Sequence, residues 1–426
     1  MLHNRTNLHQ QILFYLLVLI TVTLPFTVRI NSFFIILLAT NWVLEGSFKS
    51  KFIRLKSSKL ALLSIGFYIY HLIGLTYTDD LQSGFSDIET KLSLFLFPMV
   101  IGSSPPLSRK KLDILLKGFI AACIVAILIC FGYAFYQYFI NHTTTYFYYH
   151  ELSRTIRIHA IYLAMYLNFS IGIIIYFLSR DWNRIYTIHK LLYIAIIVFF
   201  SVGIFFLASK IIIICFFIFC NVFIARLVFL KRGLATAIIL TALINIVIFA
   251  LLLSIPYTKE RFLVEKDLNF DFIEKNEYDR EYSGFVLRVV LWKFSADILN
   301  AQQGWIAGVG TGDGQKFLDQ RYRDHGMYTG NINFNDRGYL GYNTHNQYMQ
   351  FLLSLGIIGI LYFIVILCLS TAQAIQHKNY LYLYFLLLFA ISAVSEANLC
   401  TQKGVVFYAL FHTLFVASYQ KSQFAV

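Results

Sequence analysis

Long apolar runs, such as residues 211–230 and 234–256, constrain this chain more than any other feature of its sequence. Runs of roughly 17 to 25 apolar residues are long enough to cross the hydrocarbon core of a bilayer as α-helices. Transmembrane β-strands would instead be short and would alternate apolar with polar residues. A content of 58% hydrophobic and 13% charged residues, with a mean hydropathy of +0.66, is typical of an integral membrane protein.

The sequence therefore predicts an all-α integral membrane protein with about twelve transmembrane helices. The predicted spans lie near residues 11–28, 30–48, 60–77, 92–104, 112–140, 158–178, 191–208, 211–230, 234–256, 347–369, 380–396 and 404–419. If the spans alternate in direction, the basic loops fall on one side: 49–59, 108–111, 179–190 and 231–233. The positive-inside rule predicts that this side and both termini face the cytoplasm.

One long polar segment, residues 257–344, interrupts the apolar runs and faces the opposite side in this topology. It holds 13 acidic and 11 basic residues and is nearly neutral, although the whole chain has a net charge of +13. We therefore expect three parts. Residues 1–256 would form a bundle of nine spans, residues 257–344 a large, mostly helical periplasmic domain, and residues 345–426 three further spans.

Two motifs in this segment predict local structure. Residues 283–302 have the spacing of an amphipathic helix, with one face formed by Phe285, Val289, Trp292, Phe294 and Ile298. The stretch GWIAGVGTGDG at 304–314 predicts a turn or tight loop. It lacks the preceding strand and the Gly-Lys-Ser/Thr ending of nucleotide loops. A loop of this kind is able to turn its backbone N–H groups towards a ligand.

Three cations approach the same predicted face of the membrane. Lys210 lies at a turn between two spans, Arg157 at the start of another span, and Arg288 on the amphipathic helix. Two interpretations remain open for each. Long basic side chains commonly snorkel to the interface. An excess of cations outside the cytoplasm also indicates an anionic partner such as phosphate, which a guanidinium binds in bidentate fashion.

Other partners and sites are not expected. Because the positive charge is divided among short loops between spans, it indicates contact with membrane lipids and no nucleic acid. The six cysteines lie mostly inside spans and form no C-x-x-C pair, so we expect neither a disulfide framework nor a metal site.

His345 stands directly before the tenth span, in the stretch HNQYMQFLLSLGIIGILYF. A histidine at an interface is either a hydrogen-bonded structural residue or a general base, because imidazole is suited to removing a hydroxyl proton near neutral pH. Glu396 lies at the outward end of the eleventh span. It is placed either to pair with Lys403 or Lys210 or to orient the histidine.

Several of these segments together resemble the O-antigen ligase and polymerase superfamily. HNQYMQFLLSLGIIGILYF is similar to its histidine-asparagine motif, which enters a span through two glycines, here Gly356 and Gly359. LRVVLWKFSADIL followed by GVGTGD is similar to its arginine-tryptophan helix and glycine-rich turn. LASKIII and SEANLCTQKGVVFYALF resemble its serine-cation turn and closing glutamate pattern. The resemblance covers the C-terminal half well, and Lys210 departs from the arginine that members more often carry.

This resemblance implies a multi-pass glycosyltransferase of the bacterial inner membrane. Such an enzyme moves a glycan from undecaprenyl diphosphate to an acceptor hydroxyl at the periplasmic face, with inversion and without a metal ion or cofactor. The leading acceptor is lipid A-core oligosaccharide, which makes the enzyme an O-antigen ligase. The resemblance implies that the catalytic residues are His345, Arg288 and Lys210, and that the substrate-binding residues are Arg157, Trp292, Asn346 and Glu396.

Alternatives to this function remain open. An O-antigen or exopolysaccharide polymerase and a protein O-oligosaccharyltransferase would use the same chemistry on another acceptor. A transporter of lipid-linked sugars would also combine many spans with buried cations, but transporters usually show internal repeats and broken helices at the midplane. Here the polar residues concentrate in one outward segment, which favours an enzyme.

Overall fold

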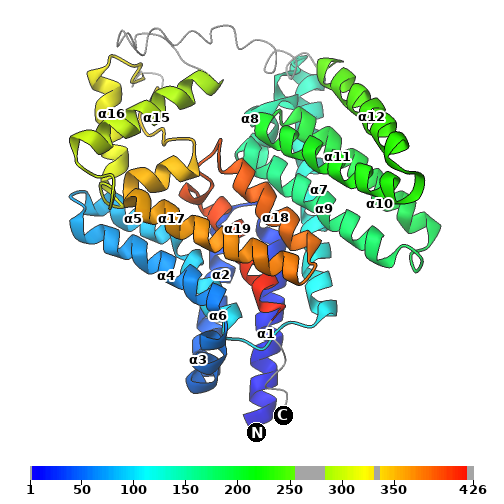
Figure 1. Ribbon diagram of the computed structural model, residues 1–426, viewed down its shortest axis with the longest axis horizontal. Helices are drawn as coiled ribbons and strands as arrows, with labels where there is room; N and C mark the ends of the chain where they lie inside the picture. Colours follow the sequence, from blue (N-terminus) through cyan, green and yellow to red (C-terminus); the bar gives the residue numbers. More distant parts are fainter. Residues whose placement is uncertain (1, 255–283, 331–335, 420–426) are drawn as a thin grey trace. The chain divides into compact units, whose positions relative to one another are not determined.

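The computed structural model describes residues 2–254, 284–330 and 336–419, and these residues form helices without a β-strand (Figure 1). The predicted all-α class is therefore confirmed for this part of the chain. Residues 257–283 and 331–335, which belong to the predicted periplasmic domain, lie outside the described residues.

Each predicted span overlaps a helix. Among the described residues, six helices are long and apolar enough to cross a membrane, namely α2 (Val28–Glu45), α4 (Lys59–Gly74, extended by η1, Leu75–Tyr77), α7 (Arg109–Asn141), α9 (Ala160–Asp181), α10 (Thr187–Phe206) and α17 (Gln347–Gln376). The shorter apolar helices include α18 (Tyr380–Ser392) and α19 (Gln402–Ala417). The chain is thus a helical membrane protein, because helices of this length and hydropathy are able to cross the hydrocarbon core of a bilayer.

The chain divides into two units. The first comprises Met1–Leu13, Ile36–Leu112 and Asp267–Val426, and the second comprises Phe14–Ile35 and Asp113–Lys266. Besides α4 and α17 to α19, the first contains α3 (Phe48–Ser57), α5 (Leu81–Lys91), α6 (Ser93–Gly102), α15 (Gly284–Ala301) and α16 (Asp313–Asp324). The second contains most of α7, with α8 (Tyr149–Ser153), α9, α10, α11 (Lys210–Arg232) and α12 (Leu234–Ser254). Helix α1 (Leu2–Thr23) and helix α2 contribute residues to both.

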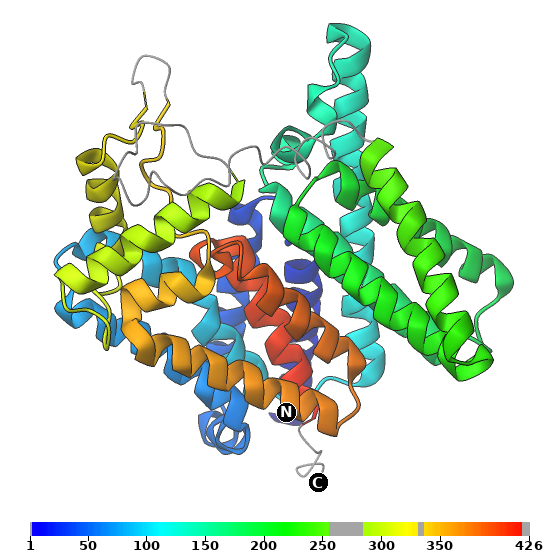
Figure 2. The ribbon, with the colours of Figure 1, turned by 45° about the horizontal axis from the view of Figure 1, so that its top comes forward.

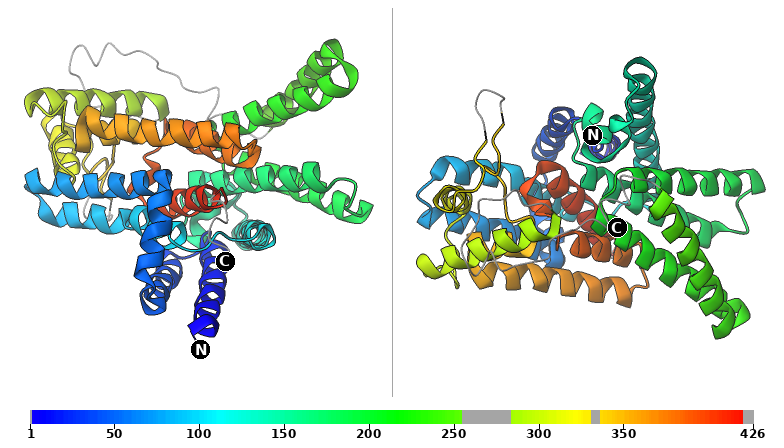
Figure 3. Two further views of the ribbon diagram at one scale, coloured as in Figure 1. Left: turned by 60° about the horizontal axis from the view of Figure 1, so that its bottom comes forward. Right: turned by 90° about the horizontal axis from the view of Figure 1, so that it is seen from above.

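In the first unit, α19 is the central helix. It packs against α6, and α17 packs against α4 and α18 (Figure 3). Every residue of α19 from Lys403 to Ala417 is buried. A helix that is apolar and buried on all sides belongs to the interior of a bundle.

In the second unit, α9 packs against α10 and α11, and α11 packs against α12 (Figure 1). Gly203 permits the close approach of α10 to α9, because a Cβ there would lie 2.9 Å from a methyl carbon of Leu167. The carboxamides of Asn221 and Asn245 donate hydrogen bonds to each other, which satisfies both polar groups between α11 and α12.

Helices α15 and α16 build a small domain with its own hydrophobic core, which we call the α15–α16 domain (residues 284–330 and 336–344). The core is formed by Val286, Leu287, Val290, Leu291, Phe294, Ile298, Leu299, Val309, Leu318, Tyr322, Met327, Tyr339 and, from α17, Leu353. Helix α15 lies along the N-terminal part of α17 (Figure 2). The domain is thereby attached to the membrane helices through an apolar contact.

The amphipathic helix predicted over 283–302 is confirmed, but its predicted face is wrong. Phe294 and Ile298 are buried in the core, whereas Phe285 is 45% exposed and Val289 and Trp292 are only half-buried. At 3.6 residues per turn, positions 285, 289 and 292 form one stripe and positions 287, 291, 294 and 298 another. The predicted face combined residues of both stripes.

Helix α17 is broken at Gly356, where the backbone has φ 66° and ψ −168°. The break was not predicted, because the sequence indicated one continuous span with glycines for close helix contact. A Cβ at this position would overlap the carbonyl group of Ile306. Gly356 therefore admits the backbone of the glycine-rich loop, in a conformation that essentially only glycine adopts.

The glycine-rich loop replaces the hydrogen bonds that the break removes from α17. The N–H groups of Val309 and Gly310 donate to the carbonyls of Leu353 and Ser354, at 2.8 and 3.1 Å. On the other side of the break, the N–H of Ile357 donates to the carbonyl of Trp305 at 2.9 Å. The broken helix thus keeps these polar backbone groups satisfied, and each of them would cost free energy if it were buried without a partner.

The far end of the same loop is attached to the region after α4. The N–H of Thr311 donates to the carbonyl of Gly74 at 3.3 Å, and the buried carboxylate of Asp313 accepts hydrogen bonds from the N–H groups of Asp79 and Asp80 at 2.8 and 2.7 Å. The N–H groups of Val309, Gly310 and Thr311 in the loop thus all donate to carbonyl groups of the protein itself. The loop therefore acts as a structural connection between α4 and α17.

The contact at Gly356 yields a stability prediction. Gly356→Ala should lower the free energy of unfolding by about 3 kcal/mol, because it combines the cost of a left-handed backbone, about 1–2 kcal/mol, with a steric clash of about 1–3 kcal/mol. Gly326→Ala is the matched control, since Gly326 has φ 65° but no atom lies within 4 Å of the place that a Cβ would take. Thermal unfolding in detergent should separate the two variants, and equal losses would contradict the clash.

Candidate active site

His345 lies at the end of the loop that leads from the α15–α16 domain into α17. Its backbone is left-handed, with φ 44°, and its N–H donates to Oδ1 of Asn343 at 2.9 Å. A left-handed conformation costs free energy for a non-glycine residue and persists only where surrounding contacts impose it. The imidazole is half-buried and packs edge-to-face against the ring of Tyr342, with centroids 5.5 Å apart.

Asn346 begins α17 as its N-cap. Its Oδ1 accepts hydrogen bonds from the N–H groups of Tyr348 and Met349 at 2.9 and 3.1 Å. These N–H groups have no partner within the helix, so the cap satisfies them. The cap determines where the helix starts and therefore keeps His345 immediately outside it.

Glu396 pairs with His345. Its Oε2 lies 3.4 Å from Nδ1 of the imidazole, and its side chain is buried. From the sequence, Glu396 was expected either to pair with a lysine or to orient His345. The structure places its carboxylate against the histidine. A carboxylate at Nδ1 orients the ring and stabilises the positive charge that forms when the other nitrogen, Nε2, takes up a proton.

Two loops meet at this pair, and Gln347 joins them. The N–H of Gln347 donates to the carbonyl of Ala393 at 2.8 Å, and its Oε1 accepts from the N–H of Leu399 at 2.6 Å. Both partners belong to the 393–401 loop that carries Glu396 between α18 and α19. Gln347 was not singled out from the sequence, because only tertiary contacts distinguish it from other polar residues at a helix start.

Helix α15 brings Arg288 and Trp292 to the same two loops. The Nε of Arg288 donates to the carbonyl of Ser395 at 3.1 Å, and one terminal nitrogen donates to the carbonyl of Gly284 at 2.8 Å. The indole Nε1 of Trp292 donates to the carbonyl of Thr344 at 3.0 Å. Of the seven residues singled out from the sequence, the first unit thus gathers Arg288, Trp292, His345, Asn346 and Glu396 in adjoining segments.

The other two expected site residues belong to the second unit. Lys210 is the first residue of α11 and is half-buried, directly after the buried N-cap residue Ser209. Arg157 is exposed and has a left-handed backbone, with φ 54°, before α9. Their action together with the residues of the first unit remains a prediction.

Tyr342 is a site residue that the sequence did not reveal. Its ring is 40% exposed beside His345, and its carbonyl accepts hydrogen bonds from the hydroxyl of Tyr322 at 2.8 Å and from Nε2 of Gln315 at 3.1 Å. Burial raises the pKa of Tyr322 well above its usual value, so its hydroxyl remains a donor. The only sequence signal for a role of Tyr342 in the site is its position three residues before His345.

Cys400 lies in η5 (Asn398–Cys400), four residues after Glu396. Burial raises the pKa of its thiol to about 12. The thiol is therefore neutral at physiological pH and is not suited to act as a nucleophile.

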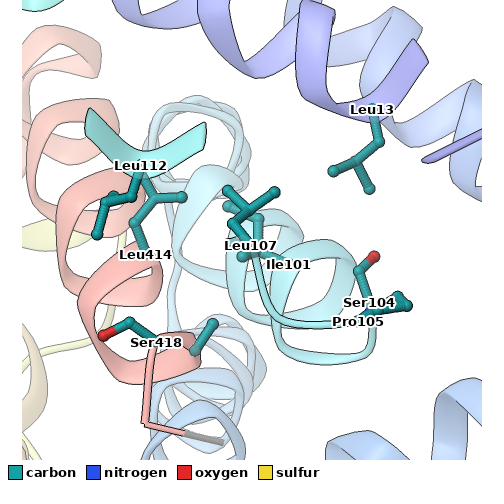
Figure 4. A pocket seen from close by; sticks show the side chains of 9 residues that line it. Leu13, Ile101, Ser104, Pro105, Leu107, Leu112, Leu414 and Ser418 are labelled. Carbon is teal, nitrogen blue, oxygen red and sulfur yellow. The ribbon is translucent and has the colours of Figure 1, made fainter. Parts of the chain in front are cut away.

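A small pocket of the first unit lies away from this site (Figure 4). It is lined mainly by apolar side chains, including Leu13, Ile101, Leu107 and Leu414, with the hydroxyls of Ser104 and Ser418. These residues surround the C-terminal end of α19, whereas the loop bearing Glu396 precedes its N-terminal end. The pocket is therefore not part of the candidate active site.

The fold and the site define a class: a multi-pass helical membrane protein with a histidine–carboxylate pair and an arginine at the start of a broken apolar helix. The family model for O-antigen ligase matches residues 195–364, so this segment is similar to the O-antigen ligase superfamily and supports the resemblance that the motifs indicate. The match includes Lys210, Arg288, Trp292, His345 and Asn346. A comparison with curated proteins found no match. The family indicates an enzyme of the ligase or polymerase type.

The N-cap yields a second prediction. Asn346→Ala should lower the free energy of unfolding by about 1 kcal/mol, whereas Asn346→Asp should retain the cap. Asn379→Ala is a matched control, because Asn379 caps α18 by accepting from the N–H of Tyr382 at 3.1 Å. Unfolding in detergent should give similar losses for both alanine variants. An unchanged stability for Asn346→Ala would show that the cap does not contribute.

Proposed function

We propose that this protein is an O-antigen ligase-type glycosyltransferase. It transfers a glycan from undecaprenyl diphosphate to an acceptor hydroxyl, with lipid A-core oligosaccharide as the leading acceptor, at the periplasmic face of the inner membrane. The observation that carries this proposal is the pairing of His345 with Glu396 at 3.4 Å, beside the loop contact of Arg288 and at the start of a long apolar helix.

In this reaction His345 is the general base. Because Nδ1 faces the carboxylate of Glu396, Nε2 accepts the proton from the acceptor hydroxyl. The resulting alkoxide-like oxygen bonds to the anomeric carbon while the bond from that carbon to the diphosphate oxygen breaks. The lipid diphosphate leaves with the bonding electrons. Attack from the opposite side inverts the anomeric configuration, and no metal or nucleotide is needed in this scheme.

The cations would stabilise the leaving group. Negative charge grows on the diphosphate oxygens as the glycosidic bond breaks, so fixed cations stabilise the transition state more than the ground state. We assign this role to Arg288 and Lys210, with Arg157 as a further contact. Arg288 is suited to it because a guanidinium carries five N–H donors in a planar fork, and its contact with Ser395 holds that fork beside the Glu396 loop.

Loss of the base is the first test of this function. His345→Ala should reduce transfer about 10²- to 10⁴-fold, the usual contribution of a general base, whereas Glu396→Gln should reduce it about 10- to 100-fold because the ring loses its oriented carboxylate. The measurement is the transfer rate from undecaprenyl diphosphate-linked glycan to lipid A-core in proteoliposomes. Wild-type activity in a folded His345→Ala protein would overturn the proposed mechanism.

The same assay identifies the acceptor. Product on lipid A-core supports the ligase, a ladder of longer polyprenyl-linked glycan indicates a polymerase, and glycan on a protein hydroxyl indicates an O-oligosaccharyltransferase. Passage of intact lipid-linked glycan across the bilayer, without any transfer, would indicate a transporter and contradict the proposal.

Removal of the cations is a further test. The double variant Arg288→Ala, Lys210→Ala should lose about 10³-fold or more in the rate of transfer, because each charged contact to the leaving group contributes about 2–4 kcal/mol to transition-state stabilisation. Lys316→Ala is the control, since Lys316 is an exposed cation of α16 in the α15–α16 domain. Full activity in the double variant would contradict the assignment of the diphosphate contacts.

A further inference from the structure

Helix α15 touches both loops of the candidate active site through residues one helical turn apart. Arg288 donates to the carbonyl of Ser395, and Trp292 donates to the carbonyl of Thr344. Each carbonyl belongs to the residue immediately before a member of the pair: Ser395 precedes Glu396, and Thr344 precedes His345. Residues at i and i+4 lie on the same face of a helix, so one face of α15 holds the two loops.

From this arrangement we propose that Trp292 is a positioning residue, which acts on the reaction by holding the peptide group before His345. This inference rests on the proposed function and assigns Trp292 a role other than contact with the substrate. The oxygen of that peptide group accepts from the indole of Trp292, and its N–H donates to Asn343. Because both polar atoms of the group are held, the direction of the Cα–Cβ bond of His345 depends on little besides its own φ, and the imidazole is then oriented by its contact with Glu396.

The strain at His345 explains why the peptide group before it has to be held by Trp292. Its φ of 44° is unfavourable for a residue with a side chain, and release would let the backbone relax. Relaxation would turn the imidazole away from Glu396, and a displacement of about 1 Å can reduce a catalytic rate about 100-fold.

Helix α15 is rigid enough to hold this peptide group in place through Trp292. The opposite stripe of the helix is buried in the α15–α16 domain, where it contributes Leu291, Phe294 and Ile298 to the core, and the same core includes Leu353 of α17. Helix α17 also starts at the Asn346 cap, directly after the histidine. The helix that carries Trp292 and the helix that follows His345 therefore share one packed core, and the indole hydrogen bond links rigid parts.

The test removes the indole donor and keeps an aromatic ring. Trp292→Phe should lower kcat about 10- to 100-fold in proteoliposomes, with the KM values for undecaprenyl diphosphate-linked glycan and for lipid A-core changed by less than about twofold. Trp305→Phe is the matched control, because the indole of Trp305 donates to Asn300 at 2.8 Å elsewhere in the same domain. This control should keep wild-type kinetics.

A double-mutant cycle with Glu396→Gln separates positioning from a general loss of stability. If Trp292 acts through the pair, Trp292→Phe should cost less than about threefold in the Glu396→Gln protein, because orientation towards the carboxylate no longer matters there. A tryptophan analogue with sulfur in place of the indole N–H provides a second, shape-matched variant. It should reproduce the kcat loss with an unchanged unfolding temperature.

Three outcomes would overturn this inference: unchanged kcat in both folded variants, equal losses with and without Glu396→Gln, or an increase in KM at constant kcat, which would make Trp292 a substrate contact. The His345→Ala control keeps the two proposals apart. If that variant is active, the proposed function fails. If it is inactive while both Trp292 variants are unaffected, only the positioning role fails.

Discussion

The backbone contact at the break of α17 is the constraint on which the rest of the first unit depends. A helix interrupted in its interior leaves carbonyl and N–H groups without partners, and each costs free energy when it is buried away from water. The glycine-rich loop supplies those partners from Trp305 to Gly310, and glycine at 356 is what lets the two backbones approach. The loop and the broken helix therefore require each other.

This connection places the candidate active site. The loop continues into α16, its Asp313 carboxylate is held by the backbone after α4, and the short segment of α17 before the break begins at the Asn346 cap. The site is consequently built where the α15–α16 domain meets the membrane helices of the same unit. That location suits a reaction between a lipid-linked group and an acceptor from the aqueous side, which is the reaction we propose.

Sequence periodicity predicted the helices well and their tertiary contacts poorly. Apolar runs located the helices because the length of a span and its hydrophobicity are local properties. The buried face of α15 was assigned incorrectly because Phe285 and Phe294 are equally apolar, and only the position of the neighbouring core decides which one is covered. The break at Gly356 was missed for the same reason, since a glycine pair is compatible with close helix packing as well as with an interruption.

For the candidate active site, too, the sequence predicted which residues take part, and the tertiary structure decided how they contact one another. The sequence by itself determined the membrane class, the candidate histidine, arginine and tryptophan, and their order along the chain, because composition and motifs are readable without coordinates. Only the tertiary structure decided that Glu396 is the partner of His345, that Gln347 joins their loops and that the indole of Trp292 reaches Thr344. The physical reason is that these contacts depend on how loops separated by about 50 residues are brought together, and hydrogen bonds of about 3 Å are specified by packing and not by sequence pattern.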